Sequence, residues 1–270
     1  MNRQPFDVWA VGAAYERYMG RWSRLVAREF AAWLSCEDKL RWVDVGCGTG
    51  VLSAAVTARW RPRTMVGIDR SEGFVAAART TAPVSAHFIV ADAMRLPVRD
   101  GACDAAVSGL ALNFLPLPAA AVAEMARVVR PGGLIAAYVW DYADGMGFLR
   151  RFWDAAVQVD PSAAALDEGR RFPVCRPERL RAVWAEAGLV DVSIASIEVA
   201  TVFTDFADLW NPFLAGQGPA PGYVAALTPA GRERLREALS AAVPTEPDGS
   251  IALTARAWAV SGRKVHAEAT

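Results

Sequence analysis

The sequence is poor in the residues on which several kinds of site depend. Its 270 residues include only two histidines and four cysteines, and no two cysteines form a C-x-x-C pair. The cysteines are Cys36, Cys47, Cys103 and Cys175. Neither a zinc-binding spacing nor a disulfide framework is supported, so we expect no metal site. We also expect the protein to work in the reducing cytoplasm.

An excess of charge of either sign is also missing. Lysine and arginine together number 29, as do aspartate and glutamate, so the formal net charge is zero. A surface that binds the nucleic-acid backbone needs many basic side chains, so we expect no nucleic-acid partner. Because no apolar run is long enough to cross a bilayer, and Met1 to Trp9 lack the apolar part of a signal peptide, we expect no membrane span. We expect a monomer or a homodimer.

Apolar residues, in contrast, make up 53% of the chain, which is enough for a large core. Between residues 41 and 140, short apolar runs alternate with helical stretches, a pattern typical of βαβ units around a parallel sheet. The predicted strands are 41–45, 64–68, 86–90, 104–108 and 134–140, and the predicted helices are 51–60, 71–80 and 118–130. The sequence therefore predicts an α/β domain.

The two ends of the chain are less regular. The first 40 residues favour a helical cap that packs on this domain. After residue 141 we expect helices at 148–158, 177–187, 204–214 and 229–241, a polar stretch at 160–173, and strands at 190–202 and 250–260.

A glycine-rich turn, Asp44-Val45-Gly46-Cys47-Gly48-Thr49-Gly50, ends the first predicted strand and opens a helix. Glycine permits a positive φ and has no Cβ to collide with a ligand that lies across the turn. The helix that follows directs free N–H groups to the same place, which suits a carboxylate or a phosphate. A tight turn without a ligand is the alternative.

Two phosphate-binding interpretations of this turn fail. A P-loop requires a lysine after its last glycine, and none follows here. A dinucleotide-binding turn requires G-x-G-x-x-G, and Val51 stands where its third glycine is needed. The pattern that remains is Gly46-x-Gly48-x-Gly50 preceded by Asp44.

Two further carboxylates follow the next two predicted strands. Asp69 lies about twenty residues beyond the glycine turn, where an acidic residue can bind the hydroxyls of a ribose. Asp92 can accept a hydrogen bond from an exocyclic amine such as that of adenine. Each alone is as readily a turn or capping residue, but the ends of parallel strands meet at one crevice of an open α/β sheet.

In these features the chain resembles the class I S-adenosylmethionine-dependent methyltransferases, within the group that includes the ubiquinone and menaquinone C-methyltransferases (methyltransferase type 11). The matching segments are VDVGCGTG (43–50), GIDRSEGFVAAAR (67–79), ADAMRLP (91–97), DAAVSGLALNFLP (104–116) and RVVRPGGLI (127–135). They cover about the middle hundred residues, and the two ends match only in outline.

The resemblance implies a Rossmann-like sheet of seven strands in the order 3-2-1-4-5-7-6, with helices on both faces. The seventh strand would be antiparallel and corresponds to 250–260. We therefore expect residues 1–40 to form a helical cap of the same domain and residues 41–270 to form the methyltransferase domain. A helical lid would be inserted at about 204–245.

The resemblance also implies S-adenosyl-L-methionine as the cofactor and a place for it. Gly46, Gly48 and Gly50, with Cys47 between them, would approach its methionine part, and Asp44 would support the loop near its amino group. Asp69 would bind the ribose hydroxyls, Arg70 would flank the adenine, and Asp92 with Ala93 would contact the adenine edge. Ser108, Gly109 and Leu110 would lie beside the sulfonium.

Two residues of the cap are candidates for the cofactor's carboxylate. Arg21 can bind a carboxylate through two parallel N–H bonds, although a surface arginine is an equal alternative. Tyr18 is a weaker candidate for the same wall, as is Tyr15.

Methyl transfer needs little from the protein beyond alignment and the exclusion of water, because the cofactor carries the electrophile. The family often has a histidine where this chain has Asn113, and neither His87 nor His266 is well placed as a base. Asp141 and Tyr142 are the candidate catalytic residues, although a turn residue is the simpler interpretation of Asp141. The aromatic residues between 140 and 213 favour an apolar or aromatic small molecule as acceptor.

The sequence thus predicts a methyltransferase that acts on O, N or C of a small metabolite. The alternative is a pericyclase-like enzyme or a binding protein that uses the same cofactor without methyl transfer. A nicotinamide-dependent oxidoreductase is disfavoured by Val51, and methylation of a macromolecule by the neutral charge.

Overall fold

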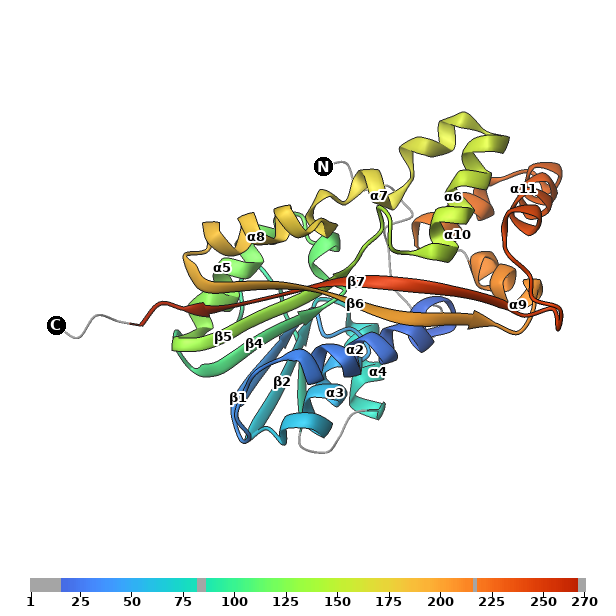
Figure 1. The fold of residues 1–270 in the computed structure, drawn as a ribbon. Helices are drawn as coiled ribbons and strands as arrows, with labels where there is room; N and C mark the ends of the chain where they lie inside the picture. The colour runs from blue at the N-terminus through green and yellow to red at the C-terminus, as the bar shows by residue number, and fades with distance from the viewer. Residues whose placement is uncertain (1–15, 82–85, 216–217, 267–270) are drawn as a thin grey trace.

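The computed structural model describes residues 16–81, 86–215 and 218–266, and its centre is a single seven-stranded sheet. The strand order is β3-β2-β1-β4-β5-β7-β6, which confirms the predicted order (Figure 1). The strands are β1 (Arg41–Val45), β2 (Thr64–Asp69), β3 (Ala86–Val90), β4 (Cys103–Gly109), β5 (Val129–Trp140), β6 (Leu189–Phe203) and β7 (Ile251–Lys264). The first five strands pair in parallel, and β7 is antiparallel to both β5 and β6.

Helices cover both faces of this sheet, with α2, α3 and α4 on one face and α5 and α8 on the other (Figure 1). The helices are α2 (Arg21–Trp33), α3 (Val51–Trp60), α4 (Glu72–Thr81), α5 (Pro118–Val128), α6 (Gly147–Val159), α7 (Glu168–Arg171), α8 (Pro177–Glu186), α9 (Phe206–Trp210), α10 (Pro219–Ala226) and α11 (Pro229–Ala242). None of the helices in these described ranges is long and apolar enough to cross a membrane.

The ends of several helices follow from local sequence. The Ser71 hydroxyl accepts a hydrogen bond from the backbone N–H of Phe74 and so caps the start of α4. Thr228 caps α11 in the same way, with Pro229 in the first helical position. Short helical turns, α7 among them, span residues 161–175 and include most of the expected polar stretch 160–173.

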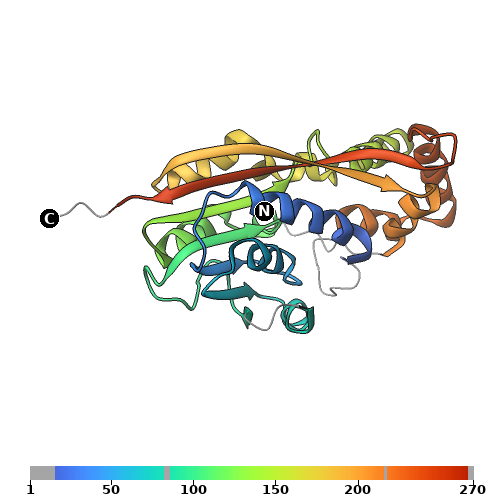
Figure 2. The same cartoon turned by 60° about the horizontal axis from the view of Figure 1, so that its bottom comes forward.

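The long β6–β7 ribbon extends well beyond the parallel part of the sheet. Strand β6 has 15 residues and β7 has 14, against 5 in β1. Helices α6, α9, α10 and α11 gather at the far end of this ribbon, opposite the C-terminus (Figures 1 and 2). The sheet thus has two parts, the parallel strands and the β6–β7 ribbon, and different helices pack on each part.

Helix α2 joins these two parts. It packs against α3 and against β6, and it buries Trp22, Val26 and Phe30. Within residues 1–40, expected to form a cap, the described part begins at residue 16, and Tyr15 lies outside it.

An ion-pair network fixes the end of the sheet opposite the glycine turn. Asp104, at the start of β4, accepts a hydrogen bond from the backbone N–H of Arg41 at 2.8 Å and two from its guanidinium at 2.9 Å. The Arg130 guanidinium adds a fourth at 2.8 Å. These contacts link the starts of β1, β4 and β5, and they hold the pKa of Asp104 well below its usual range.

We predict that Asp104→Asn lowers the free energy of unfolding by about 1–2 kcal/mol at pH 7, because charge-assisted hydrogen bonds are lost. A group with a depressed pKa stabilises the fold above its unfolded pKa and loses that effect as the pH falls. The difference from wild type should therefore shrink between pH 5 and pH 2 in urea unfolding. Asp100→Asn, which removes a contact of an 81% exposed carboxylate with Arg127, is the control and should have a small effect. A difference for Asp104→Asn that does not change with pH would contradict the prediction.

Candidate functional site

The glycine turn after β1 has the backbone that only glycine adopts readily. Gly46, Gly48 and Gly50 have φ values of 72°, 52° and 84°. A Cβ on Gly46 would lie 2.4 Å from the Cβ of Ala111, in the segment after β4. Gly46 therefore permits the close approach of two strand ends at the point where the sheet order reverses, between β1 and β4.

Asp69 joins this turn to the end of β2. One oxygen of its carboxylate accepts the backbone N–H of Gly48 at 3.0 Å, and the other accepts that of Ser71 at 2.9 Å. Burial raises the pKa of Asp69, although both backbone hydrogen bonds favour the charged form. Each carboxylate oxygen retains a lone pair that can accept a further hydrogen bond, for example from a ribose hydroxyl.

Asp44 lies at the base of the turn and is completely buried. Its Oδ2 accepts a hydrogen bond from the Ser53 hydroxyl at 2.7 Å, while its Oδ1 has no hydrogen-bond partner among the described residues. Burial raises the pKa of Asp44 to about 7. A buried acceptor without a donor is costly, so a donor from a bound molecule would stabilise it.

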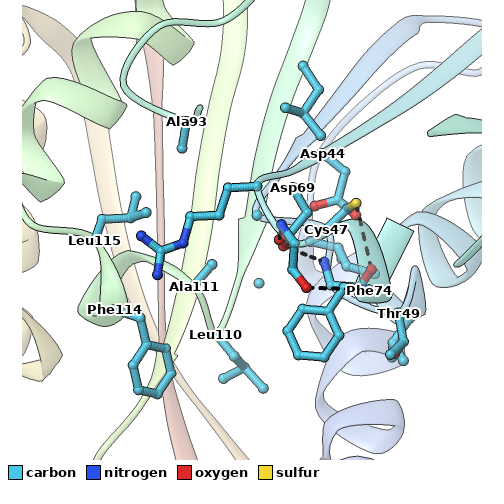
Figure 3. Close-up of a pocket in the computed structure, with 18 of the residues that line it drawn as sticks. Asp44, Cys47, Thr49, Asp69, Phe74, Ala93, Leu110, Ala111, Phe114 and Leu115 are labelled. Carbon is cyan, nitrogen blue, oxygen red and sulfur yellow. Dashed lines mark hydrogen bonds between the residues drawn. The ribbon is translucent and has the colours of Figure 1, made fainter. Parts of the chain in front are cut away.

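A cavity of about 260 Å³, here named the large cavity, opens at the carboxyl ends of β1, β2, β3 and β4. Figure 3 shows Asp44, Cys47, Asp69 and Phe74 on one side of it and Ala93, Ala111, Phe114 and Leu115 on the other. It is therefore a crevice with a polar glycine-rich wall and a mainly apolar opposite wall.

The segment after β4 forms part of the apolar wall. Leu110 has a φ of 57°, a conformation that is uncommon for a residue with a Cβ, and its N–H donates to the carbonyl of Tyr138 at 2.8 Å. A Cβ on Gly109 would lie 2.7 Å from the Tyr138 hydroxyl oxygen. Backbone strain of this kind is found most often where a structure holds a ligand.

The structure brings most of the predicted cofactor residues together around the large cavity. Those that line it are Asp44, Gly46, Cys47, Gly48, Asp69, Arg70, Asp92, Ala93, Gly109 and Leu110. Gly50 and Ser108 lie close by without lining it. A Cβ on Gly50 would touch the Phe88 ring at 3.3 Å, so this glycine serves packing, and Ser108 is fully buried within β4.

The two predicted cap residues lie elsewhere. The guanidinium of Arg21 pairs with Asp208 of α9 at 3.0 Å and stacks over Trp22 and Phe203, so it is already bound to a carboxylate of the protein. Tyr18 is buried against aromatic side chains of the ribbon end and does not line the large cavity. Among residues 1–40, it is Ser23 that the structure places in the lining of the large cavity.

The two candidate catalytic residues also lie outside the large cavity. The buried carboxylate of Asp141 is bound by the Arg256 guanidinium at 2.7 Å and accepts the backbone N–H of Asp144 at 3.2 Å. These contacts fit a turn residue, the simpler alternative from the sequence, and the catalytic role stays a prediction. Tyr142 lines a separate small cavity together with Tyr18.

Other residues at the site gave no signal in the sequence. Phe74 is an ordinary first-turn helix residue in sequence, yet it lines the large cavity beside Asp69. Phe114 lines both cavities, and Glu168 is a buried carboxylate on the small one. Glu168 falls in the stretch 160–173, which is expected to be polar, so the local sequence does not distinguish it from its neighbours.

The structure combines this sheet order with a crevice that is lined by a glycine turn and two strand-end carboxylates, at the place where open α/β sheets bind ligands. Residues 43–137 match the family Methyltransf_11, described as a methyltransferase domain. These residues, which carry the glycine turn, Asp69 and Asp92, are thus similar to a methyltransferase domain.

Known relatives agree with this assignment. The chain is 34% identical over 95 residues to a malonyl-[acyl-carrier protein] O-methyltransferase of Marinomonas sp., covering 34% of this chain and 35% of that protein. It is 35% identical over 117 residues to the 2-methyl-6-phytyl-1,4-hydroquinone methyltransferase of Synechocystis sp., covering 43% and 36%. The chain thus spans only about a third of the length of these relatives.

A solved structure extends the likeness of the fold to almost the whole chain. Phosphoethanolamine N-methyltransferase 2 of Haemonchus contortus, in complex with phosphomonomethylethanolamine and S-adenosylhomocysteine, superposes with a TM-score of 0.58 at 13% identity. The match covers 94% of this chain and 57% of that one.

The residues present fit the cofactor of this family, S-adenosyl-L-methionine. The unpaired Oδ1 of Asp44 offers an acceptor for an amino group, and Asp69 retains lone pairs for hydroxyl groups. A Cβ on Gly48 would meet no protein atom within 4 Å, so protein packing does not account for the space beside this glycine.

We predict that Asp69→Ala raises the dissociation constant for S-adenosylmethionine about 10- to 100-fold. Hydrogen bonds to a charged group contribute about 1.5–3 kcal/mol, and the glycine turn loses its tie to β2. Calorimetric titration measures the change, with Asp154→Ala on the exposed side of α6 as the control. An unchanged affinity would remove Asp69 from the ribose-binding role.

Proposed function

We propose that the chain is an S-adenosylmethionine-dependent methyltransferase that transfers a methyl group to O, N or C of a small apolar or aromatic metabolite. The observation that carries this proposal is the large cavity itself, in which the glycine turn, Asp69 and Asp92 converge at the point where the strand order reverses. Its opposite wall is mainly apolar, which suits such an acceptor.

In this proposal each wall of the cavity has one task. Asp69 holds the ribose, Asp92 and Ala93 contact the adenine, and Asp44 faces the amino group. When bound, the cofactor supplies a methyl group on a positively charged sulfur, which is already electrophilic. The backbone at Leu110 and the ring of Phe114 exclude water and orient the acceptor.

The alternative keeps the cofactor and omits the transfer, as in a pericyclase-like enzyme or a binding protein. The two predicted catalytic residues, Asp141 and Tyr142, lie outside the large cavity, so neither is a base that lines it. Alignment alone can promote methyl transfer, however, so the missing base does not favour this alternative over the first.

We further propose that residues 1–40 form a cap on the methyltransferase domain and that residues 204–245 form a lid. Pro219 of α10 supports the lid because it lines the small cavity. The four cysteines are all free thiols, which supports work in the reducing cytoplasm. We also propose that the protein is a monomer or a homodimer and that it has no nucleic-acid partner.

The decisive assay uses S-adenosylmethionine labelled in its methyl group with a panel of small apolar metabolites that carry hydroxyl, amine or activated carbon groups. We expect labelled product from at least one acceptor. Calorimetry should detect binding of S-adenosylmethionine and of its demethylated product, but no binding of NAD. Failure of both sulfur nucleotides to bind would refute the proposal. Tight binding without any labelled product would favour the non-methylating alternative.

We also predict that cofactor binding at pH 7 releases protons, because a positively charged amino group near Asp44 lowers a pKa that burial had raised to about 7. The binding enthalpy should then depend on the ionisation enthalpy of the buffer. Asp44→Asn keeps an acceptor for the Ser53 hydroxyl and should weaken that dependence, whereas Asp154→Asn should not. Equal buffer dependence in wild type and Asp44→Asn would place the amino group elsewhere.

A further inference from the structure

A small cavity of about 10 Å³ lies next to the large cavity. Leu110 and Phe114 line both, so these two side chains form the partition between them. The remaining lining comes partly from Tyr18, Tyr142 and Glu168. The volume corresponds to about one water molecule, so it has room for a single small polar group.

Glu168 is the ionisable carboxyl group of this small cavity, and it is only 2% exposed. The indole Nε1–H of Trp153 donates a hydrogen bond to its Oε2. The cation that acts on it, Arg150, is already bound to Asp167 through two guanidinium nitrogens. Burial raises the pKa of Glu168 to about 7.

Such a carboxyl group is costly to keep in the core. Removing a carboxylate from water costs several kcal/mol unless hydrogen bonds or a cation compensate. A backbone hydrogen bond and the Trp153 indole compensate only in part, because a carboxylate can accept about four hydrogen bonds. With these two donors in place, the Glu168 carboxylate can still accept a further hydrogen bond from a group in the small cavity.

We propose that the small cavity is the polar subsite for the methyl acceptor, in which Glu168 accepts a hydrogen bond from a hydroxyl group on an otherwise apolar molecule. The inference rests on the proposed function and adds the group by which the acceptor is recognised. The apolar body of the acceptor would lie against Leu110 and Phe114, on the side of the large cavity.

A hydroxyl group fits this subsite better than an ammonium group does. A hydroxyl has one proton to donate, and one carboxylate oxygen satisfies it. An ammonium group has three donors, and a cavity of about 10 Å³ that is otherwise mostly apolar would leave some of them without acceptors. The methyl ether of the same molecule has no donor and should be rejected.

The test uses the protein saturated with S-adenosylhomocysteine and three probes: 4-ethylphenol, its methyl ether and 4-ethylbenzylamine. We expect 4-ethylphenol to bind at least tenfold more tightly than the other two. Glu168→Gln, which keeps an acceptor for the Trp153 indole, should lose at least tenfold in affinity for the phenol. Glu186→Gln, an exposed position at the end of α8, is the matched control and should bind as wild type does.

The pH dependence gives a second readout that loss of packing would not produce. A donated hydrogen bond favours the charged carboxylate, so 4-ethylphenol should bind more tightly as the pH rises from 6 to 8. The charged groups beside Glu168 are the Arg150 guanidinium, which stays charged over this range, and the Asp167 carboxylate paired with it, and the Tyr142 phenol lines the same cavity. Burial raises the pKa of the Tyr18 phenol and of the Cys175 thiol, away from this range.

Glu168→Gln should abolish this pH dependence, whereas the exposed control Glu186→Gln should leave it unchanged. No binding of 4-ethylphenol, equal affinity in wild type and Glu168→Gln, or tighter binding of the amine would each overturn the inference. These outcomes are separate from the proposed function, which fails only if the sulfur nucleotides do not bind or no methyl group is transferred.

Discussion

The hydrogen bonds that Asp69 accepts from Gly48 and Ser71 are the contacts on which the rest of the site depends. They connect the turn after β1 with the start of α4, so a single side chain holds together the two segments that form the polar wall of the large cavity. The close approach of Gly46 to Ala111 is a second constraint, and it positions the apolar wall that follows β4. Both act at the carboxyl ends of parallel strands, where the register of β1 with β2 and β4 brings distant parts of the sequence together.

Local sequence was sufficient for this half of the molecule. Strand and helix periods, the glycine turn and the carboxylates after β2 and β3 are all encoded over short stretches, and the resemblance to a known class supplied the strand order. Long-range partners were not encoded in the same way. Arg21 finds Asp208 at a separation of 187 residues, and nothing near Arg21 in the sequence indicates that partner. Glu168 looks like a surface residue in sequence because its burial depends on α6, the segment after β5 and the cap.

Two buried carboxyl groups, Asp44 and Glu168, stand on opposite sides of the partition formed by Leu110 and Phe114. Burial raises the pKa of each to about 7, and each has a single neutral side-chain donor, Ser53 or Trp153. In both places the fold carries an electrostatic cost that a bound molecule could relieve. A ligand that donates a hydrogen bond to one of these carboxyl groups would bind more tightly than one without a donor at that place. The same contact would therefore both strengthen binding and select the ligand.

The antiparallel strand β7 has a consequence for how such a protein can diversify. Because β7 and β6 form a ribbon that runs past the parallel strands, their outer portions and the helices at their far end can change in length without altering the register of β1, β2 and β4. The glycine-rich wall of the large cavity is thereby separated from changes in the ribbon and its helices. If the proposed function holds, such a chain can change its acceptor in the course of evolution while the parallel strands and the glycine turn stay as they are.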